Sequence, residues 1–293
     1  MRALHDLIDF PPRSEKPRRR GITMIIDETS FGARNPELMA YADFIDLVKM
    51  TIPGVWISDQ TFRENLKLYR NAGVDIQLGG VPYELAVAQG KQEQFLDRML
   101  ELGANIVEVE NHTGAMDMAE MQHEVRRLKD RGFGVVSEVG AKWVQFDDTR
   151  KDKNSIDISA VVDKIGQLIE AGSDHIYWEG MVVRALLGNR LENESGQQQL
   201  LEVMRQVDAE KVILEVWSAR GAPNTPLWAW LVHHLGPEVN LANVPSNQIM
   251  FLESIRHGCF YDPGHPYLRW LNGNRPVEKW WQMPLPDYKT DLV

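Results

Sequence analysis

A repeated unit runs along most of the chain. In each unit a short, β-branched apolar run ends in polar residues and leads through a loop into a helical pattern. The apolar runs cover residues 21–28, 43–50, 74–81, 104–111, 133–140, 174–180, 211–217 and 238–244. Apolar strands that alternate with helices are typical of a parallel sheet covered by helices, and eight units, about 30 residues apart, are the number that closes a barrel. The sequence therefore predicts an α/β fold, a single-domain (β/α)8 TIM barrel.

The segments between these runs carry the signals of helix starts and stops. Ser58 or Asp59 can cap the first turn of one helix, and Gly73 can adopt the left-handed conformation that ends it. Glycines end the same pattern at positions 103, 132 and 172. After the eighth run, Pro245 begins a last predicted helix that extends to about Gly258.

Two segments lie outside the eight units. The predicted boundaries are an N-terminal arm over 1–20, the barrel over 21–258 and a C-terminal extension over 259–293. The arm holds a basic cluster of Arg13, Lys16, Arg18, Arg19 and Arg20. We interpret this cluster as a solvated lead-in to the first strand rather than as an anion-binding arm. The extension is rich in Trp and Pro, and we expect it to pack on the barrel or on a neighbouring subunit.

Charge and cysteine content exclude several classes of protein. The 293 residues include 32 Lys and Arg against 42 Asp and Glu, a net charge of −10, which is the wrong sign for binding a phosphate backbone. Cys259 is the only cysteine, so no internal disulfide can form. No apolar run approaches the roughly 20 residues of a membrane-spanning helix, and the N-terminus lacks the apolar core of a signal peptide. We expect a cytoplasmic protein that binds neither nucleic acid nor membrane.

Several widespread catalytic motifs are absent from the sequence. It has no G-x-G-x-x-G after the first strand, no G-x-x-x-x-G-K-[ST], no H-E-x-x-H, no C-x-x-C and no G-x-S-x-G. Dinucleotide, P-loop, zinc-protease and α/β-hydrolase chemistries therefore lose support.

Polar residues gather at the ends of the predicted strands, which face the active site in a TIM barrel. They are Asp27, Glu28, Lys49, Glu108, Glu110, Glu138, Glu179, Glu215, Asn240 and Asn243. Several buried carboxylates raise one another's pKa and destabilise the fold unless a cation lies among them. A hard divalent ion, Mg²⁺ above all, binds carboxylates, waters and substrate oxygens. The pattern predicts a Mg²⁺ site that receives a small anionic substrate.

Each of these residues also has a structural interpretation. A single strand-end glutamate can cap the next helix or pair with an arginine. Lys49, between two apolar residues, is better placed to face a substrate than solvent. Gly79 and Gly80 fit a close approach of the backbone to a ligand and a tight turn equally well. His112 is isolated after the fourth strand and is interpreted as a loop residue.

Seven short segments at the strand ends resemble, in order and spacing, the motifs of the phosphosulfolactate synthase family. They are DLVK (46–49), LGG (78–80), ELAVAQGK (84–91), SEVG (137–140), EG (179–180), VNLAN (239–243) and LESIRHG (252–258). The resemblance implies a (β/α)8 barrel that uses Mg²⁺ to add sulfite to phosphoenolpyruvate, giving phosphosulfolactate on the route to coenzyme M. Related sequences include plant heat-stress-associated proteins, which leaves a non-catalytic role open.

The same resemblance implies roles for individual residues. The implied metal ligands are Glu138, Glu179 and Glu215. The expected substrate contacts are Gly79, Gly80, Arg184, Arg220 and Arg256. Lys49 would bind an anionic group of the substrate, Glu138 would also take part in catalysis, and Lys142 would be the general acid. In the family two lysines follow SEVG, whereas here the first position holds Ala141.

The departures from the family pattern concern basic residues. Met181 stands where the family has an arginine, and Arg184 follows three positions later. Trp217 and Arg220 lie in the segment that replaces the family's FEAP, and Arg256 is kept where two other arginines are lost. Either Arg184 and Arg220 supply the missing cations, or the substrate is a less anionic enol or carboxylate than phosphoenolpyruvate. In both cases we expect a homo-oligomer.

Overall fold

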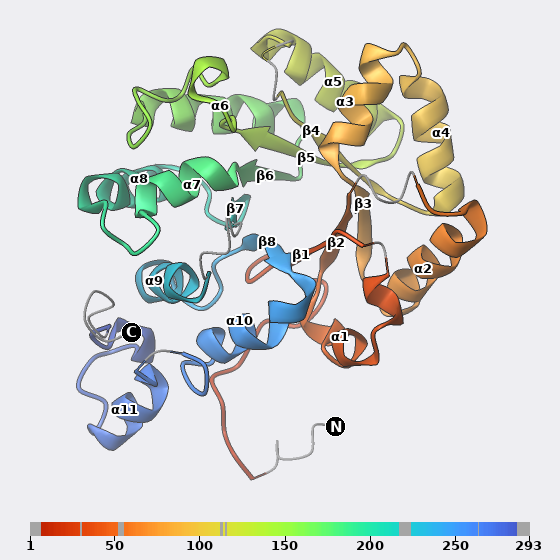
Figure 1. The fold of residues 1–293 in the computed structure, drawn as a ribbon. Helices are drawn as coiled ribbons and strands as arrows, with labels where there is room; N and C mark the ends of the chain where they lie inside the picture. Colours follow the sequence, from red (N-terminus) through yellow and green to blue (C-terminus); the bar gives the residue numbers. More distant parts are fainter. Residues whose placement is uncertain are drawn as a thin grey trace.

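The computed structural model describes residues 7–29, 31–51, 56–111, 114, 116–216, 224–262 and 264–285. Eight parallel strands form a closed barrel in which β1 pairs with both β2 and β8 (Figure 1). The strands are β1 (Thr23–Asp27), β2 (Leu47–Met50), β3 (Asp75–Leu78), β4 (Ile106–Val109), β5 (Gly134–Val139), β6 (His175–Trp178), β7 (Val212–Glu215) and β8 (Leu241–Pro245). Seven lie wholly within the predicted runs and β8 extends one residue beyond its run, so the predicted TIM barrel is confirmed.

Helices cover the outside of the barrel between consecutive strands and after β8 (Figure 1). They are α1 (Pro36–Ala40), α2 (Asp59–Asn71), α3 (Gly80–Ala88), α4 (Gln92–Leu102), α5 (Met118–Asp130), α6 (Ile158–Ala171), α7 (Gly180–Leu187), α8 (Glu194–Gln206), α9 (Thr225–Leu235), α10 (Ile249–Arg256) and α11 (Pro266–Asn272). Ser58 caps α2 by accepting a hydrogen bond from the Thr61 amide. Gly103 and Gly172 end α4 and α6 in the left-handed conformation, as the sequence predicts.

The alternation of side chains along each strand separates two apolar cores. On β6, Tyr177 belongs to the cluster inside the barrel, which also contains Met24 and Val136. Its neighbours Ile176 and Trp178 face the helices and belong to the larger outer core. Because side chains of a strand point alternately to opposite faces, every second residue faces the barrel axis. Polar residues at these inward-facing positions, near the carboxyl ends of the strands, therefore point into the mouth of the barrel.

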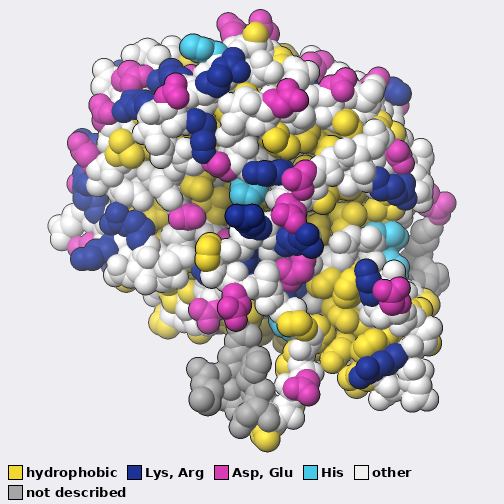
Figure 2. All heavy atoms as spheres, turned by 180° about the vertical axis from the view of Figure 1, so that it is seen from behind, with side chains coloured by type: hydrophobic (Ala, Val, Ile, Leu, Met, Phe, Trp, Pro, Cys, Tyr) yellow, Lys and Arg dark blue, Asp and Glu magenta, His cyan; other side chains and the backbone are white. Residues whose placement is uncertain are grey.

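The N-terminal arm is fastened to the barrel by its basic residues, so the prediction of a solvated lead-in is wrong for Arg13 and Arg18. The Arg13 side chain is 4% exposed and pairs with Glu238 and Glu253. The Arg18 side chain, also 4% exposed, lies 2.9 Å from Asp46. These pairs hold the arm against the amino-terminal ends of the strands. On the face opposite to that of Figure 1, basic side chains lie among acidic ones (Figure 2).

The segment after α10 packs on the outside of the helical ring, beside α9 and α10 (Figure 1). Trp280 is buried and lies edge-on to Trp281, with ring centroids 5.7 Å apart. Trp270 donates from its indole nitrogen to the Val277 carbonyl, which closes the turn after α11. Within the described ranges, every helix is too short or too polar to cross a lipid bilayer.

Candidate active site

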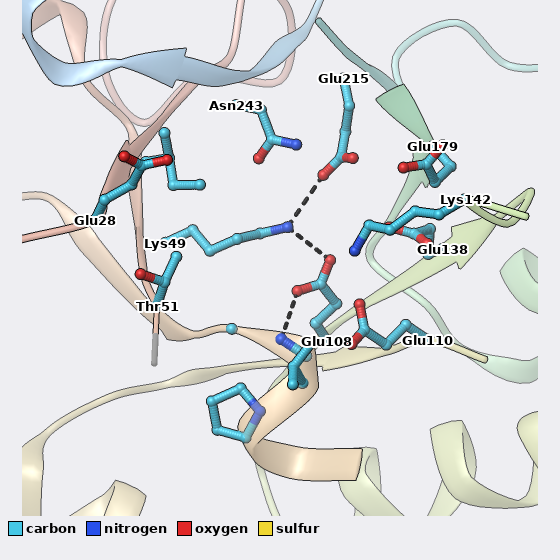
Figure 3. A pocket seen from close by; sticks show the side chains of 15 residues that line it. Glu28, Lys49, Thr51, Glu108, Glu110, Glu138, Lys142, Glu179, Glu215 and Asn243 are labelled. Atoms are coloured by element: carbon cyan, nitrogen blue, oxygen red, sulfur yellow. Dashed lines mark hydrogen bonds and ion pairs between the residues drawn. The ribbon is translucent and has the colours of Figure 1, made fainter. Parts of the chain in front are cut away.

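A cavity of about 210 Å³ opens at the carboxyl ends of the strands, inside the barrel mouth (Figure 3). Its described lining residues are Ile26, Glu28, Lys49, Thr51, Gly79, Gly80, Val81, Pro82, Glu108, Glu110, Glu138, Lys142, Glu179, Glu215 and Asn243. Six of these residues are glutamates and two are lysines. The barrel topology therefore brings together carboxylates that lie far apart in the sequence.

Lys49, on β2, lies between two of the glutamates (Figure 3). Its ammonium donates to Glu108 at 2.8 Å and to Glu215 at 3.1 Å. It also lies 4.8 Å from the ring centroid of Tyr177. Burial alone lowers the pKa of Lys49, but the two carboxylates outweigh burial and raise this pKa well above its ordinary value. Lys49 is thus a charged residue of the barrel mouth, and its hydrogen-bond partners are the carboxylates of Glu108 and Glu215.

Glu108, on β4, is held through both of its oxygens. While Oε1 accepts from Lys49, Oε2 accepts from the side-chain amide of Gln77 at 2.7 Å and from the Gly80 backbone amide at 2.8 Å. The Glu108 side chain is fully buried. Three donors around one carboxylate fix its orientation.

Three carboxylates converge closely enough to share one cation. One oxygen from each of Glu108, Glu110 and Glu138 lies within 4.8 Å of the others. Burial, followed by the charges of Glu215 and Glu110, raises the pKa of Glu138 well above its ordinary value. Close buried carboxylates of this kind need protons or a metal ion to offset their repulsion. The donor set is oxygen alone, which fits a hard divalent ion.

Gly79 and Gly80 both line the cavity, but only Gly80 has a steric reason to be glycine. A Cβ at position 80 would overlap the carboxyl group of Glu110, whereas a Cβ at position 79 would make ordinary contacts. Gly80 also begins α3, and its amide is the one that binds Glu108. The backbone at Gly80 therefore approaches Glu108 and Glu110 closely, which a larger residue would prevent.

Glu179 and Glu215, the other implied metal ligands, have structural partners of their own. Glu179 caps α7 by accepting from the backbone amides of Met181 at 2.6 Å and Val182 at 3.2 Å. Burial and then the charge of Glu215 raise the pKa of Glu179 to about 7. Both residues line the cavity, but the closest group of carboxylates shares only Glu138 with the expected metal set.

Lys142 lies in the loop after β5 and points into the cavity toward the glutamates (Figure 3). Asp147 shapes this loop, since its carboxylate accepts from the Ala141 amide at 2.9 Å and from the Thr149 amide at 3.0 Å. The positive charge of Lys142 lowers the pKa of Glu179 against the effect of burial. The structure thus brings Lys142 to the same cavity as Lys49.

Two of the expected arginine contacts, Arg184 and Arg256, do not belong to the described lining of this cavity. Arg184, on α7, is buried and donates to the side chains of Asn224 at 2.6 Å and Asn189 at 3.2 Å. Arg256 donates to the carbonyls of Pro237, Val239 and Ile22, which precede β8 and β1.

Neither Arg256 nor Arg184 belongs to the described lining of the cavity, but the two residues lie in different parts of the fold. Arg256 is fully buried, because α10 runs back along the barrel and delivers it to the amino-terminal end of the strands, away from the position expected of a substrate contact. Arg184 is absent from the described lining of the cavity. Arg220, Trp217 and His112 lie outside the described residues.

Asn243 also lines the cavity. Its position at a strand end can be predicted from the sequence, but the backbone conformation that turns its side chain toward the cavity cannot. Its φ of 56° is in the left-handed region. The register between β1 and β8 shifts there, since Thr23 pairs with Leu241 and Ile25 with Val244. The bulge redirects the side chain into the mouth, and asparagine tolerates this conformation better than most residues. Glu108 and Glu110 also stand out at the end of β4, at alternate positions, but their partners could not be read from the sequence.

Comparison of the sequence with known proteins identifies one family and relatives that carry the same description. The model of the family described as (2R)-phospho-3-sulfolactate synthase (ComA) matches residues 11–262. Phosphosulfolactate synthase from Methanothermobacter thermautotrophicus is 29% identical over 252 residues, covering 85% of this chain and 93% of the relative. Phosphosulfolactate synthase from Methanocaldococcus jannaschii is 28% identical over 244 residues, covering 82% and 92%.

Solved structures agree on the fold alone. The carboxyl transferase domain from Rhizobium etli pyruvate carboxylase with 3-bromopyruvate has a TM-score of 0.52 at 11% identity, covering 91% of this chain and 46% of that chain. The family model, by contrast, spans most of the sequence and includes every strand of the barrel. The chain therefore belongs to the (2R)-phospho-3-sulfolactate synthase (ComA) family.

Proposed function

We propose that this chain catalyses the Mg²⁺-dependent addition of sulfite to phosphoenolpyruvate, which gives phosphosulfolactate. The observation that carries the proposal is the convergence of Glu108, Glu110 and Glu138 beside Lys49 and Lys142 in the barrel mouth. Such a mouth combines a place for a hard cation with two ammonium groups for anions and protons. Membership of the family supports the reaction type.

The residues present fit a Mg²⁺ ion. Glu108, Glu110 and Glu138 would hold it, because their oxygens converge within 4.8 Å. Glu179 and Glu215 line the same cavity and add negative charge around that position. When bound, Mg²⁺ would supply positive charge that stabilises the negative charge building on substrate oxygens.

The lysines would act on the substrate directly. In the proposed reaction the sulfur of sulfite bonds to C3 of phosphoenolpyruvate, and the π electrons between C2 and C3 move into the carboxylate as an aci-carboxylate. Lys142 would then donate a proton to C2, which restores the carboxylate and completes phosphosulfolactate. Lys49 uses two of its three N–H groups on Glu108 and Glu215, which leaves one to bind an anionic oxygen of the substrate.

The direct test is turnover of phosphoenolpyruvate and sulfite by the full chain with Mg²⁺, followed by mass spectrometry of the sulfonate product. Removal of divalent ions with a chelator should abolish turnover, and added Mg²⁺ should restore it. Lys142→Met should lower kcat by about 100- to 10,000-fold, as expected for loss of a general acid. Lys151→Met, an exposed lysine farther along the same loop, is the matched control and should leave kcat unchanged. Turnover that persists after chelation contradicts the metal-dependent reaction.

A second candidate function has an observation of its own. Among the described lining residues the only cations are Lys49 and Lys142, while Arg184 binds two asparagines. Phosphate, carboxylate and sulfite together require several charge-assisted hydrogen bonds. This scarcity of cations favours a less anionic enol or carboxylate as the substrate.

Met181→Arg separates the two candidate functions, because it restores a cation where the family has an arginine. If phosphoenolpyruvate is the natural substrate, kcat/KM should stay equal or rise. A wild-type enzyme that is inert toward phosphoenolpyruvate and sulfite, together with a variant that gains affinity for phosphoenolpyruvate, supports the less anionic substrate. Failure of both proteins to turn over or bind phosphoenolpyruvate would favour the non-catalytic role.

We also propose that the chain forms a homo-oligomer. Phe260 and Tyr261, in the segment after α10, are 66% and 50% exposed, and exposed apolar surface of this kind can mark a contact between proteins. Light scattering after size exclusion should give a mass that is a multiple of 33.5 kDa. A mass equal to that of one chain contradicts this proposal.

A further inference from the structure

A chain of buried hydrogen bonds crosses the inside of the barrel beneath the cavity. The Tyr177 hydroxyl on β6 donates to Oε1 of Gln77 on β3 at 2.8 Å. Nε2 of Gln77 donates to Oε2 of Glu108 on β4 at 2.7 Å. Tyr177 and Gln77 are both 0% exposed, and neither belongs to the described lining of the cavity.

The direction of this chain is fixed by the chemistry of its members. A tyrosine hydroxyl that donates to one end of the Gln77 amide identifies that end as the oxygen, so the nitrogen faces Glu108. An amide nitrogen can only donate, so Oε2 of Glu108 is the acceptor of this hydrogen bond. The amide can thus hold the carboxylate in one orientation.

Tyr177 contacts this network twice. Its hydroxyl orients Gln77, and its ring lies under the ammonium of Lys49, 4.8 Å from ring centroid to nitrogen. Lys49 in turn binds the other oxygen of Glu108 at 2.8 Å. Glu108 is therefore held from both sides by groups that Tyr177 contacts, and one of its oxygens lies within 4.8 Å of oxygens of Glu110 and Glu138.

We propose that Gln77, oriented by Tyr177, is a positioning residue that holds Glu108 where its carboxylate converges with Glu110 and Glu138 on a divalent cation. The proposal rests on the metal site of the proposed function and adds to it the residues that set its geometry. Outer partners of this kind typically change metal affinity by about 10- to 100-fold.

The test uses the full chain and Mn²⁺ as a paramagnetic probe, with free Mn²⁺ measured by electron paramagnetic resonance. Gln77→Met removes both hydrogen bonds at nearly constant volume, and we expect Mn²⁺ affinity to fall by about 10- to 100-fold. Gln197→Met is the matched control, because Gln197 is a buried glutamine on α8 that donates to the Leu187 and Leu191 carbonyls. It should lower thermal stability to a similar degree and leave Mn²⁺ affinity unchanged.

Tyr177→Phe keeps the ring under Lys49 and removes only the hydroxyl. We expect a smaller loss of Mn²⁺ affinity, below about 10-fold, and this variant carries the test if Gln77→Met does not fold. Equal affinity in wild type and the two network variants overturns the positioning role, and so does an equal loss in Gln197→Met. A wild-type chain that binds no Mn²⁺ overturns the metal site itself, so the two failures are distinct.

Discussion

The two ends of the barrel use buried charge in opposite ways. At the amino-terminal end, Arg13 pairs with Glu238 and Glu253, and Arg256 binds backbone carbonyls. At the carboxyl end, six glutamates face two lysines in one cavity. Buried charges are balanced at the amino-terminal end, whereas negative charge is in excess at the carboxyl end.

This difference indicates which end of the barrel a bound ligand would stabilise. Buried ions that are paired keep an element in place, and removal of one partner is costly. Buried carboxylates in excess destabilise the fold until a cation or protons arrive. We therefore expect substitutions at the mouth to affect function with little loss of stability, and substitutions at the amino-terminal end to do the reverse.

The largest effect is expected for Glu138→Gln, which keeps the shape of the side chain and removes a charge from the mouth. Loss of a metal contact worth about 4 kcal/mol corresponds to roughly a 1000-fold decrease in kcat/KM. Without divalent ions, the free energy of unfolding in urea should be unchanged or higher, because repulsion from Glu215 and Glu110 is relieved. A variant that loses stability and keeps activity would contradict the comparison.

Arg256→Met should have the largest effect on stability. The arginine is fully buried and bridges the carbonyls of Ile22, Pro237 and Val239, and the variant leaves the carbonyls of Pro237 and Val239 without this donor. We expect a loss of about 3–5 kcal/mol in the free energy of unfolding, measured by urea denaturation. The Mn²⁺ affinity of the folded fraction should match that of wild type, and a large loss of affinity would restore a ligand-binding role for Arg256.

Arg13→Met should cost about 2–3 kcal/mol, because hydrogen bonds to charged groups are lost and Glu253 remains buried. Burial alone raises the pKa of Glu238, but Arg13 and Ser14 hold it below its ordinary value. A lowered carboxylate pKa stabilises the fold above the unfolded pKa, and this stabilisation is lost as pH falls through the folded pKa. The difference between Arg13→Met and wild type, measured by urea denaturation, should therefore shrink in acid.

The mouth should show the opposite pH dependence. The pKa of Glu179 is raised from 4.5 to about 7, so the folded state retains a proton that the unfolded state releases. Stability of the metal-free chain should therefore fall by on the order of 2 kcal/mol from pH 5 to pH 7.5. Thermal denaturation at several pH values checks this, and Glu179→Gln should flatten the curve. A rise in stability across this range would contradict the assigned cause.

The smallest effect is expected for Arg20→Met, which sharpens the contrast within the arm. The Arg20 side chain is 66% exposed and its partner Glu210 is 37% exposed. Exposed ion pairs contribute little because water and salt screen them. The free energy of unfolding should stay within about 0.5 kcal/mol of wild type, and a larger loss would mean that the whole basic cluster fastens the arm.

The fold and the candidate positions of the site follow from local sequence patterns. Apolar runs, caps such as Ser58 and stops such as Gly103 depend on neighbouring residues, so they predict the eight strands and several helix ends. The strand-end position of Lys49 and Glu138 is likewise local, and both lie in the cavity. The sequence by itself therefore determined the barrel and the residues available to its mouth.

Only the tertiary structure decided which of these residues meet. Glu108, Glu110 and Glu138 converge because adjacent strands β4 and β5 are paired in a particular register. The burial of Arg13 depends on Glu253, 240 residues away, and the reach of Arg256 depends on the direction in which α10 returns. Contacts of this kind are set by barrel closure and strand stagger, which are properties of the whole chain rather than of any local pattern.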